Sequence, residues 1–346
     1  MRIAIDVMGG DHAPDAILSG ALDALTLLND QDQLVLVGDL RIIEDGVTAR
    51  DLSGDARIEI EPTTQIIAMD ETPVTALRAK PDSSLVRMAE LGKRRAGARR
   101  CDVIISAGNT GATVAAAQMS MRRLPGVHRP CIAVPLPTFS GNMVLCDAGA
   151  NPEPKPTHLH QYGHMGAIYS NRVLECDQPR VALLSIGGEE GKGNMLTRET
   201  HQLFKNDKRL NYIGYVEGRD LFEDRCDVVV TEGFTGNVVL KLVEGLSSGI
   251  FRAVAREFQE GAPQMAQQFG TIVKKIYAKH DYHEYGGAPL LGANGNCLIC
   301  HGSSKAITIT NSIKNALEFV RLGINDSIVE TVAAAEVNEK ATSGGA

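Results

Sequence analysis

The chain has 346 residues, of which 43% are hydrophobic and 22% are charged, which is enough for a large core in one domain or in two intertwined halves. Its net charge of −7 argues against a general nucleic-acid binder, and an acidic partner would require a local basic patch. The sequence contains no apolar run of about 18 residues that would span a bilayer and no signal-peptide pattern. We therefore expect a cytoplasmic protein whose seven scattered cysteines are reduced and packed as small hydrophobic groups.

Short β-branched runs alternate with helix-patterned segments along the whole chain. Strands are expected at residues 2–8, 34–37, 57–60, 102–106, 131–136, 143–147, 180–186, 212–215, 227–231 and 296–301. Helices are expected at residues 15–28, 83–91, 113–121, 162–169, from 195 onward, at 238–279 with a break at 261–263, and from 305 to about 337. This alternation predicts a three-layer α/β/α fold around a mostly parallel sheet that is covered on both faces. Ligands in such sheets collect at the carboxyl ends of strands. The candidate loops are those at Gly9, Gly108, Gly149, Gly187, Gly233 and Gly302.

Residues 101–114 and 226–239 have similar sequences 125 positions apart. Seven of the fourteen positions are identical, and three more exchange Ile with Val or Ser with Thr. Both copies have the pattern of a strand, a glycine turn and a helix. A helix that begins after such a turn points free backbone N–H groups at one spot, and its dipole attracts anions. The repeat therefore predicts two equivalent anion-facing loops.

The glycine-rich loop 187–194 is the strongest single indication of a phosphate site. Lys192 stands among its glycines, whose free N–H groups would bind orthophosphate. The alternative is a glycine loop that merely turns the chain. A nucleotide-binding P-loop is excluded, because only three residues separate Gly187 from Gly191 and Gly193 stands where Ser or Thr would hold magnesium. A dinucleotide site is disfavoured, because no Gly-x-Gly-x-x-Gly follows the first strand.

Two clusters of Cys and His resemble cofactor or metal motifs without completing them. Cys297-Leu-Ile-Cys300-His301 matches the c-type haem attachment pattern, but residues three apart in a strand point to opposite faces, and no second pair is spaced for zinc. His160 and His164 would share one helix face close to His158, but glutamine follows the first of them where a metalloprotease has glutamate. We expect both cysteines to be structural, and we expect neither a metal nor a cofactor.

Two charged or amphipathic segments each have a structural and a functional interpretation. The helical region 238–279 carries two apolar stripes with interleaved basic residues. It fits a hairpin packed in a core or dimer interface, or a surface that meets a membrane or an acyl chain. The basic run 93–100 fits a solvated helix cap or a docking patch for an acidic partner. The sequence leaves both pairs of alternatives open.

Five motifs occur in order along nearly the whole chain. They are Ile3-Ala-Ile-Asp-Val-Met-Gly-Gly-Asp-His-Ala-Pro14, Ser106-Ala-Gly-Asn-Thr-Gly111, Gly191-Lys-Gly-Asn194, Glu232-Gly-Phe-Thr-Gly-Asn237 and His301-Gly-Ser-Ser304. Together they resemble the phosphate acyltransferase family of bacterial phospholipid synthesis. The resemblance implies an enzyme that makes acyl phosphate from acyl-acyl carrier protein and orthophosphate. It also implies a fold similar to that of isocitrate and isopropylmalate dehydrogenases and phosphotransacetylase, with two intertwined, pseudo-symmetric halves around one mixed sheet.

The resemblance also implies how the chain is organised and what it meets. We expect one domain over residues 1–338, with a helical hairpin at about 245–282 and a flexible tail at 339–346. The family is typically a homodimer that associates loosely with the inner face of the cell membrane. The expected partners are therefore acyl-acyl carrier protein, orthophosphate, a second copy of the chain, and the membrane with its glycerol-phosphate acyltransferase. No nucleic-acid partner is expected.

The expected chemistry is direct attack of orthophosphate on a thioester, assisted by positioning and charge stabilisation. In this scheme Lys192 or the amide of Asn237 stabilises the oxyanion, and His301 and His12 are the candidates for proton handling, with a purely structural histidine as the alternative for each. The substrate-binding residues are expected to be Asp11, His12, Ser106, Asn109, Thr110, Asn151, Asn194, Glu232, Thr235, Ser303 and Ser304. Two other activities stay open: transfer from a short acyl-CoA, as in phosphotransacetylase, and a membrane-docked scaffold that only holds acyl carrier protein.

Overall fold

In the computed structural model, which describes residues 1–261, 270 and 286–343, one 11-stranded sheet runs through the molecule. The strand order is β3-β2-β1-β4-β11-β10-β5-β6-β9-β7-β8. The strands are β1 (Arg2–Asp6), β2 (Gln33–Gly38), β3 (Ile58–Pro62), β4 (Val103–Ser106), β5 (Cys131–Pro137), β6 (Asn142–Cys146), β7 (Arg180–Leu184), β8 (Asn211–Val216), β9 (Val228–Val230), β10 (Ala288–Leu291) and β11 (Asn296–Ile299).

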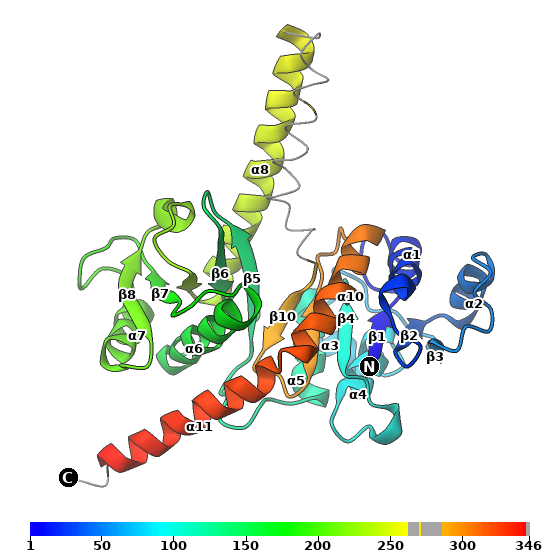
Figure 1. Cartoon of the computed structure of the whole chain (residues 1–346), viewed down its shortest axis with the longest axis horizontal. Helices are drawn as coiled ribbons and strands as arrows, with labels where there is room; N and C mark the ends of the chain where they lie inside the picture. The colour runs from blue at the N-terminus through cyan, green and yellow to red at the C-terminus, as the bar shows by residue number, and fades with distance from the viewer. Residues whose placement is uncertain (262–269, 271–285, 344–346) are drawn as a thin grey trace.

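Helices pack around this sheet (Figure 1). In the described residues the α-helices are α1 (Asp15–Asp23), α2 (Leu40–Thr48), α3 (Pro73–Ala79), α4 (Ser84–Gly92), α5 (Thr110–Ser120), α6 (Pro156–Val173), α7 (Met195–Asn206), α8 (Gly233–Gly261), α10 (Ala306–Arg321) and α11 (Ile324–Ser343). Short 3-10 helices lie at Ala24–Leu27, Gly97–Arg99 and Gly218–Phe222.

The sheet is mixed, and the strand pairing defines two lobes. In the first lobe β3, β2, β1, β4 and β11 are parallel to one another, and in the second lobe β6, β9, β7 and β8 are parallel. Antiparallel pairing of β11, β10, β5 and β6 joins the lobes. Because β11 returns from the C-terminal part of the chain to pair with β4, the two halves are intertwined. The prediction of a three-layer α/β fold with a mostly parallel mixed sheet is confirmed.

Alternate residues of the central strands pack into different layers of the core. Ile3 and Ile5 of β1 are buried in a cluster with side chains of α1 and α10. Ala4, between them, belongs to a cluster with Met88 of α4 and Val114 of α5 on the opposite face. Both faces of the sheet are therefore covered, as near-continuous apolar strands require.

Both copies of the repeated segment form the predicted strand–turn–helix unit, but their helices begin earlier than predicted. α5 starts at Thr110 and α8 starts at Gly233. Asn109 caps α5 by accepting the N–H of Ala112 at 3.0 Å, and the carboxylate of Glu232 accepts N–H groups from the first turn of α8. These caps satisfy orphan N–H groups, so each glycine turn runs directly into its helix.

Several elements differ from the sequence prediction. α2 was not expected; the carboxylate of Asp39 caps it by accepting two N–H groups at 3.0 and 3.1 Å. α3 begins at Pro73, in a stretch expected to be irregular, because proline fits the first position of a helix. β10, with Pro289, was also missed. The single helix predicted up to residue 337 is wrong, since α10 and α11 are separate helices with Gly323 at φ +62° between them.

α8 projects away from the body of the molecule, and α11 leads away from it on another side (Figure 1). α8 accounts for the predicted hairpin up to Gly261. Apart from Gly270, the rest of that hairpin lies outside the described residues, as do residues 344–346 of the expected tail. Among the helices that the structure describes, none is both long and apolar enough to cross a bilayer.

Candidate functional site

A cavity of about 380 Å³, here called the interlobe pocket, lies where the two lobes meet. Its walls come from the loops after β1, β4 and β11, from β5, and from the first turns of α8. The apolar part of the lining includes Ile132, Val134, Leu240 and Ile299. The polar part consists of Asp11, Thr110, Asn237, Lys241, Glu244 and His301. Apolar walls with a few convergent polar groups are typical of small-molecule sites.

Three loops of the first lobe meet beside this pocket, because glycine lets their backbones approach closely. A Cβ on Gly9 would lie only 2.9 Å from the Cα of Gly108. The N–H of Asp11 donates to the carbonyl of Gly302 at 2.8 Å. The motifs at residues 3–14, 106–111 and 301–304 therefore come together on one side of the pocket.

A buried carboxylate ties two of these loops together. Ser106 Oγ donates to Asp6 Oδ2 at 2.8 Å and accepts the N–H of Gly108 at 3.0 Å. Burial raises the pKa of Asp6, and its hydrogen bonds oppose that rise. Ser106 thus fixes the turn that leads into α5, and it does not itself line the pocket.

In the second lobe, the loop 147–151 is organised around another buried carboxylate. Asp147 accepts the N–H groups of Ile132 at 2.9 Å, Ala150 at 3.0 Å and Asn151 at 2.7 Å. The side-chain amide of Asn151 donates to Asp147 at 3.0 Å and to the carbonyl of Pro130 at 2.6 Å. Burial raises the pKa of Asp147, and these hydrogen bonds oppose that rise. The hydrogen bonds that the side-chain amide of Asn151 donates therefore stabilise the conformation of the loop 147–151.

The first turns of α8 pack against this loop and carry Asn237 to the pocket. The N–H of Gly233 donates to the carbonyl of Asn151 at 2.8 Å. A Cβ on Gly236 would lie 1.8 Å from the carbonyl oxygen of Asp147, so only glycine fits there. The next residue, Asn237, lines the pocket. The glycines of the 232–237 motif thus position its asparagine.

Lys241 and Glu244, which the sequence analysis did not single out, add charge to the pocket. Lys241 lies one helical turn after Asn237, and its Nζ contacts Nε2 of His301. Lys241 also donates to Glu244 Oε2 at 3.0 Å, and Ser303 Oγ lies 2.7 Å from Nδ1 of His301. Because residues four apart share a helix face, the position of Asn237 was a signal that pointed to Lys241.

Comparison with known proteins agrees with this arrangement. Residues 1–327 match the model of a family described as "Fatty acid synthesis protein". A phosphate acyltransferase of Heliobacterium modesticaldum is 44% identical over 336 residues, 96% of each chain. A phosphate acyltransferase of Halothermothrix orenii is 44% identical over 329 residues, 94% of this chain and 96% of that one. The chain belongs to the phosphate acyltransferase family.

Two solved structures of low sequence identity have a fold similar to that of this chain. A phosphotransacetylase from Streptococcus pyogenes superposes with a TM-score of 0.60 at 15% identity, over 95% of this chain and 94% of that one. The EutD phosphotransacetylase from Staphylococcus aureus gives a TM-score of 0.54 at 16% identity, over 94% of both chains. These similarities support the fold alone.

Four of the site residues predicted from the family motifs line the interlobe pocket. They are Asp11, Thr110, Asn237 and His301. Others support the pocket without lining it: Ser106, Asn109, Asn151, Ser303 and Ser304. The side-chain amide of Asn109, for example, donates to the carbonyls of Met69 and Glu71 at 3.0 Å each. His12 is exposed and does not line the pocket.

Three further predicted residues line a different cavity, of about 400 Å³. Asn194, Glu232 and Thr235 line it, and the side chain of Asn194 caps α7 through the N–H of Thr197 at 2.9 Å. Lys192 is exposed on the neighbouring glycine loop. The candidate loops at residues 108, 187 and 302 are therefore divided between two cavities in this structure. The first and third loops belong to the interlobe pocket, and the second belongs to this cavity.

Cys297 and Cys300 are buried on opposite faces of the sheet, in different hydrophobic clusters. Burial raises the pKa of Cys297 to about 12. It raises the pKa of Cys300, which lines the interlobe pocket, to about 11. Both thiols are therefore protonated near neutral pH and are poor nucleophiles.

His160 and His164 share one face of α6, as their spacing predicted. Their Nε2 atoms lie 3.0 and 2.8 Å from Oδ2 of Asp207. The guanidinium of Arg209 also donates to Asp207, at 2.8 Å. Burial, followed by the neighbouring His164, lowers the pKa of His160 to about 4. Because Arg209 already supplies the cation beside this carboxylate, we interpret the cluster as a hydrogen-bonded structural network.

Proposed function

We propose that this chain transfers a fatty acyl group from acyl-acyl carrier protein to orthophosphate, and that the acyl phosphate feeds phosphatidic acid and phospholipid synthesis. The observation that carries the proposal is the composition of the interlobe pocket. Ile132, Val134 and Leu240 offer apolar surface to an acyl chain, and Lys241 and His301 offer polar groups to phosphate and thioester. Relatives named phosphate acyltransferase, which align with 94–96% of the chain, support the same chemistry.

The start of α5 is the proposed phosphate site. Thr110 and Gly111 occupy the first turn of this 11-residue helix and line the pocket. The first N–H groups of a helix have no intrahelical partner, and the helix dipole adds to their attraction for anions. Lys241 adds a full positive charge from α8. Orthophosphate held between α5 and Lys241 is then bound by groups from both lobes.

In the proposed reaction a phosphate oxygen attacks the thioester carbonyl carbon. A C–O bond forms, and the carbonyl oxygen becomes an oxyanion that the amide of Asn237 stabilises by donating a hydrogen bond. The C–S bond then breaks, the thiolate leaves, and acyl phosphate remains. His301, held between Lys241 and Ser303, passes the proton lost by phosphate to the thiolate. Since the thiol of Cys300 is protonated, the proposal includes no acyl-enzyme.

Phosphate-dependent thiol release tests the substrate assignment. The assay compares palmitoyl-acyl carrier protein with acetyl-CoA as acyl donor. We expect saturable, phosphate-dependent release from the carrier-protein donor and much slower release from acetyl-CoA. Faster turnover of acetyl-CoA would instead indicate a phosphotransacetylase. Tight binding of the carrier protein without thiol release would indicate a scaffold.

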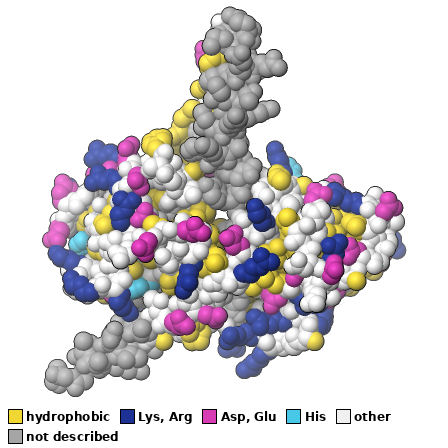
Figure 2. All heavy atoms as spheres, in the orientation of Figure 1, with side chains coloured by type: hydrophobic (Ala, Val, Ile, Leu, Met, Phe, Trp, Pro, Cys, Tyr) yellow, Lys and Arg dark blue, Asp and Glu magenta, His cyan; other side chains and the backbone are white. Residues whose placement is uncertain are grey.

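We also propose that α8 contributes to membrane association of a homodimer, which would deliver acyl phosphate to a membrane-bound glycerol-phosphate acyltransferase. Figure 2 shows hydrophobic side chains along the projecting part of α8. Every fourth residue from Phe234 to Ile250 forms an exposed apolar stripe: Phe234, Val238, Leu242, Leu246 and Ile250. Such a stripe suits the interface of an anionic membrane. The part of the predicted hairpin that follows Gly261 lies, apart from Gly270, outside the described residues. The substitution that tests the membrane proposal is therefore made in the described stripe.

Co-sedimentation with vesicles containing anionic phospholipid tests the membrane proposal. Leu246→Glu should reduce vesicle binding, because it places a charge in the middle of the stripe. Ala255→Glu is the matched control, since it adds the same charge nine residues along the exposed helix, on the opposite face. Equal binding of both variants, or no binding of the unmodified protein, would contradict the proposal.

A further inference from the structure

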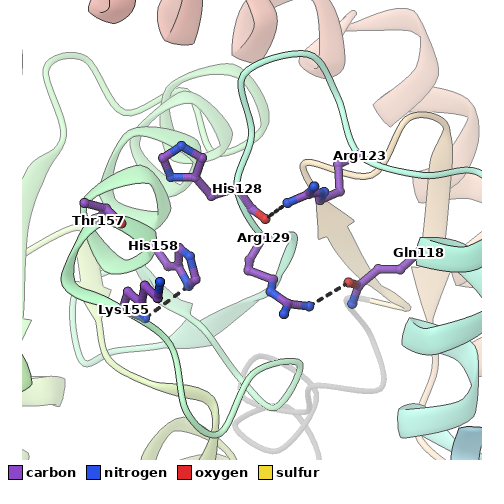
Figure 3. Close-up of a pocket in the computed structure, with 7 residues that line it drawn as sticks. All are labelled: Gln118, Arg123, His128, Arg129, Lys155, Thr157 and His158. Atoms are coloured by element: carbon purple, nitrogen blue, oxygen red, sulfur yellow. Dashed lines mark hydrogen bonds between the residues drawn. The ribbon is translucent and has the colours of Figure 1, made fainter. Parts of the chain in front are cut away.

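A strongly basic cavity of about 610 Å³ shares no lining residue with the interlobe pocket. Arg123, Arg129 and Lys155 line it, together with His128 and His158 and two uncharged polar residues (Figure 3). No carboxylate is part of its lining. In a chain with a net charge of −7, such a concentration of positive charge identifies a local site for anions.

The cavity is built from three segments: α5, which carries Gln118, the connection between α5 and β5, and the start of α6. Arg123, His128 and Arg129 lie in the connection between α5 and β5, and the guanidinium of Arg123 donates to the carbonyl of His128. Lys155 and His158 lie at the start of α6, an 18-residue helix. Figure 3 shows Arg129 reaching across the cavity toward Gln118, to which it donates at 3.3 Å. The positive end of the α6 dipole thus adds to the charge of the side chains.

Several arginines elsewhere in the described residues are paired with carboxylates, for example Arg87 with Glu61 at 2.5 Å and Arg180 with Asp227 at 3.0 Å. No such pair within 4.0 Å involves a side chain of the basic cavity in the part of the chain that the structure describes. The concentration of charge acts on His158. Burial, followed by His128, Arg129, Lys155 and Arg123, lowers the pKa of His158 to about 4.

We propose that this basic cavity binds a phosphate-bearing small molecule, at a site distinct from that of the reacting orthophosphate. Its volume lies within the range of small-molecule sites and exceeds the need of a single phosphate ion. Arginine forks and a helix N-terminus are the donors that bind phosphate oxygens. The binding site does not depend on the acyl donor that the chain uses.

His158 supplies a further donor to this site. Its Nδ1 accepts the N–H of Lys155 at 3.1 Å, so the neutral ring carries its proton on Nε2. An anion in the cavity would offset the nearby positive charges and raise the pKa of His158. Binding is therefore expected to be accompanied by uptake of a proton by His158 as the pH falls toward about 4, the pKa of this residue without the anion.

Calorimetric titration with pyrophosphate tests the proposal, because pyrophosphate is a small ligand with more than two negative charges. The double variant Arg129→Gln with Lys155→Gln should bind it at least about tenfold more weakly, since two charge-assisted hydrogen bonds are lost. The matched control is Arg94→Gln with Arg95→Gln, which removes two exposed charges from the basic run outside the cavity. The control should bind within about twofold of the unmodified protein, as expected for a localised rather than general charge effect.

Imidazole proton NMR locates the ligand. Pyrophosphate should shift the His158 signals and raise the pKa of that residue, with the signals assigned by their loss in His158→Gln. Three results would overturn the proposal: no pyrophosphate binding at millimolar concentration, equal weakening in the control variant, or unchanged His158 signals at saturation. Citrate bound as tightly as pyrophosphate would overturn the assignment to phosphate ligands.

Discussion

Nζ of Lys241 contacts Nε2 of His301 across the interlobe pocket, although the two residues are 60 positions apart in the sequence. Lys241 belongs to α8, which packs on the second-lobe loop 147–151, and His301 follows β11 of the first lobe. The contact therefore joins the lobes at the polar part of the pocket. A change in the angle between the lobes would move this cation relative to the start of α5, where we place phosphate.

Lys241→Met and Asn237→Ala should each lower turnover with palmitoyl-acyl carrier protein by about 10²-fold, as for removal of one donor that stabilises an oxyanion. Lys208→Met, which removes an exposed lysine that lines neither cavity near α8, is the matched control and should turn over normally. Steady-state kinetics and thermal unfolding separate loss of catalysis from loss of fold. Near-normal turnover of both pocket variants would place the chemistry elsewhere.

The variant Lys192→Ala tests whether the glycine-rich loop 187–194 takes part in the reaction. The loop borders the cavity at the first turn of α8, and Lys192 is exposed on it. If this lysine acts on phosphate or on the oxyanion during turnover, its loss should again lower kcat by about 10²-fold without lowering stability. We expect that loss from the position of Lys192 in the 191–194 motif, and it would require that the loop reach the interlobe pocket during turnover. Unchanged kcat and KM for phosphate would leave the interlobe pocket as the complete site.

Gly236→Ala should destabilise the protein and displace Asn237. The added methyl group would lie 1.8 Å from the carbonyl oxygen of Asp147, which forces the first turns of α8 off the loop 147–151. Forced overpacking of this kind typically costs about 1–3 kcal/mol. Gly249→Ala, further along α8 with no atom within 4 Å of the new group, should be neutral or stabilising. Chemical denaturation compares the two variants, and equal stabilities would contradict the packing argument.

The stability of the fold should fall as the pH falls from 6.5 to 4, partly because of His160. Burial lowers the pKa of His160 to about 4 in the folded chain, from 6.5 in the absence of its surroundings. The unfolded state therefore binds more protons in this pH window. Each histidine that is held neutral in this way lowers the free energy of unfolding by up to about 1.4 kcal/mol per pH unit. His160→Gln should reduce the slope of the unfolding free energy against pH. An unchanged slope would show that His160 does not titrate in this way.

The layers of the fold follow from local signals, because strands such as β1 and β2 have apolar central residues and glycine-containing turns follow them. The contact of Lys241 with His301 does not follow from local signals. It depends on how two lobes from distant parts of the chain pack, and helix spacing from Asn237 is its only local signal. The separation of Lys192 from the interlobe pocket likewise depends on which side of α8 each loop reaches. Short helices such as α2 were missed because the cap that starts them, here the carboxylate of Asp39, is not part of the apolar pattern.

The most direct test of attack by phosphate without an acyl-enzyme is whether the thioester bond breaks before phosphate is present. In a rapid-mixing experiment, enzyme at micromolar concentration meets palmitoyl-acyl carrier protein with and without orthophosphate, and free thiol is recorded. Direct attack by phosphate predicts no thiol release without phosphate, and with phosphate one acyl phosphate for each thiol at a rate that saturates with phosphate concentration. A burst of thiol equal to the enzyme concentration in the absence of phosphate, with the acyl group trapped on the protein, would contradict direct attack by phosphate.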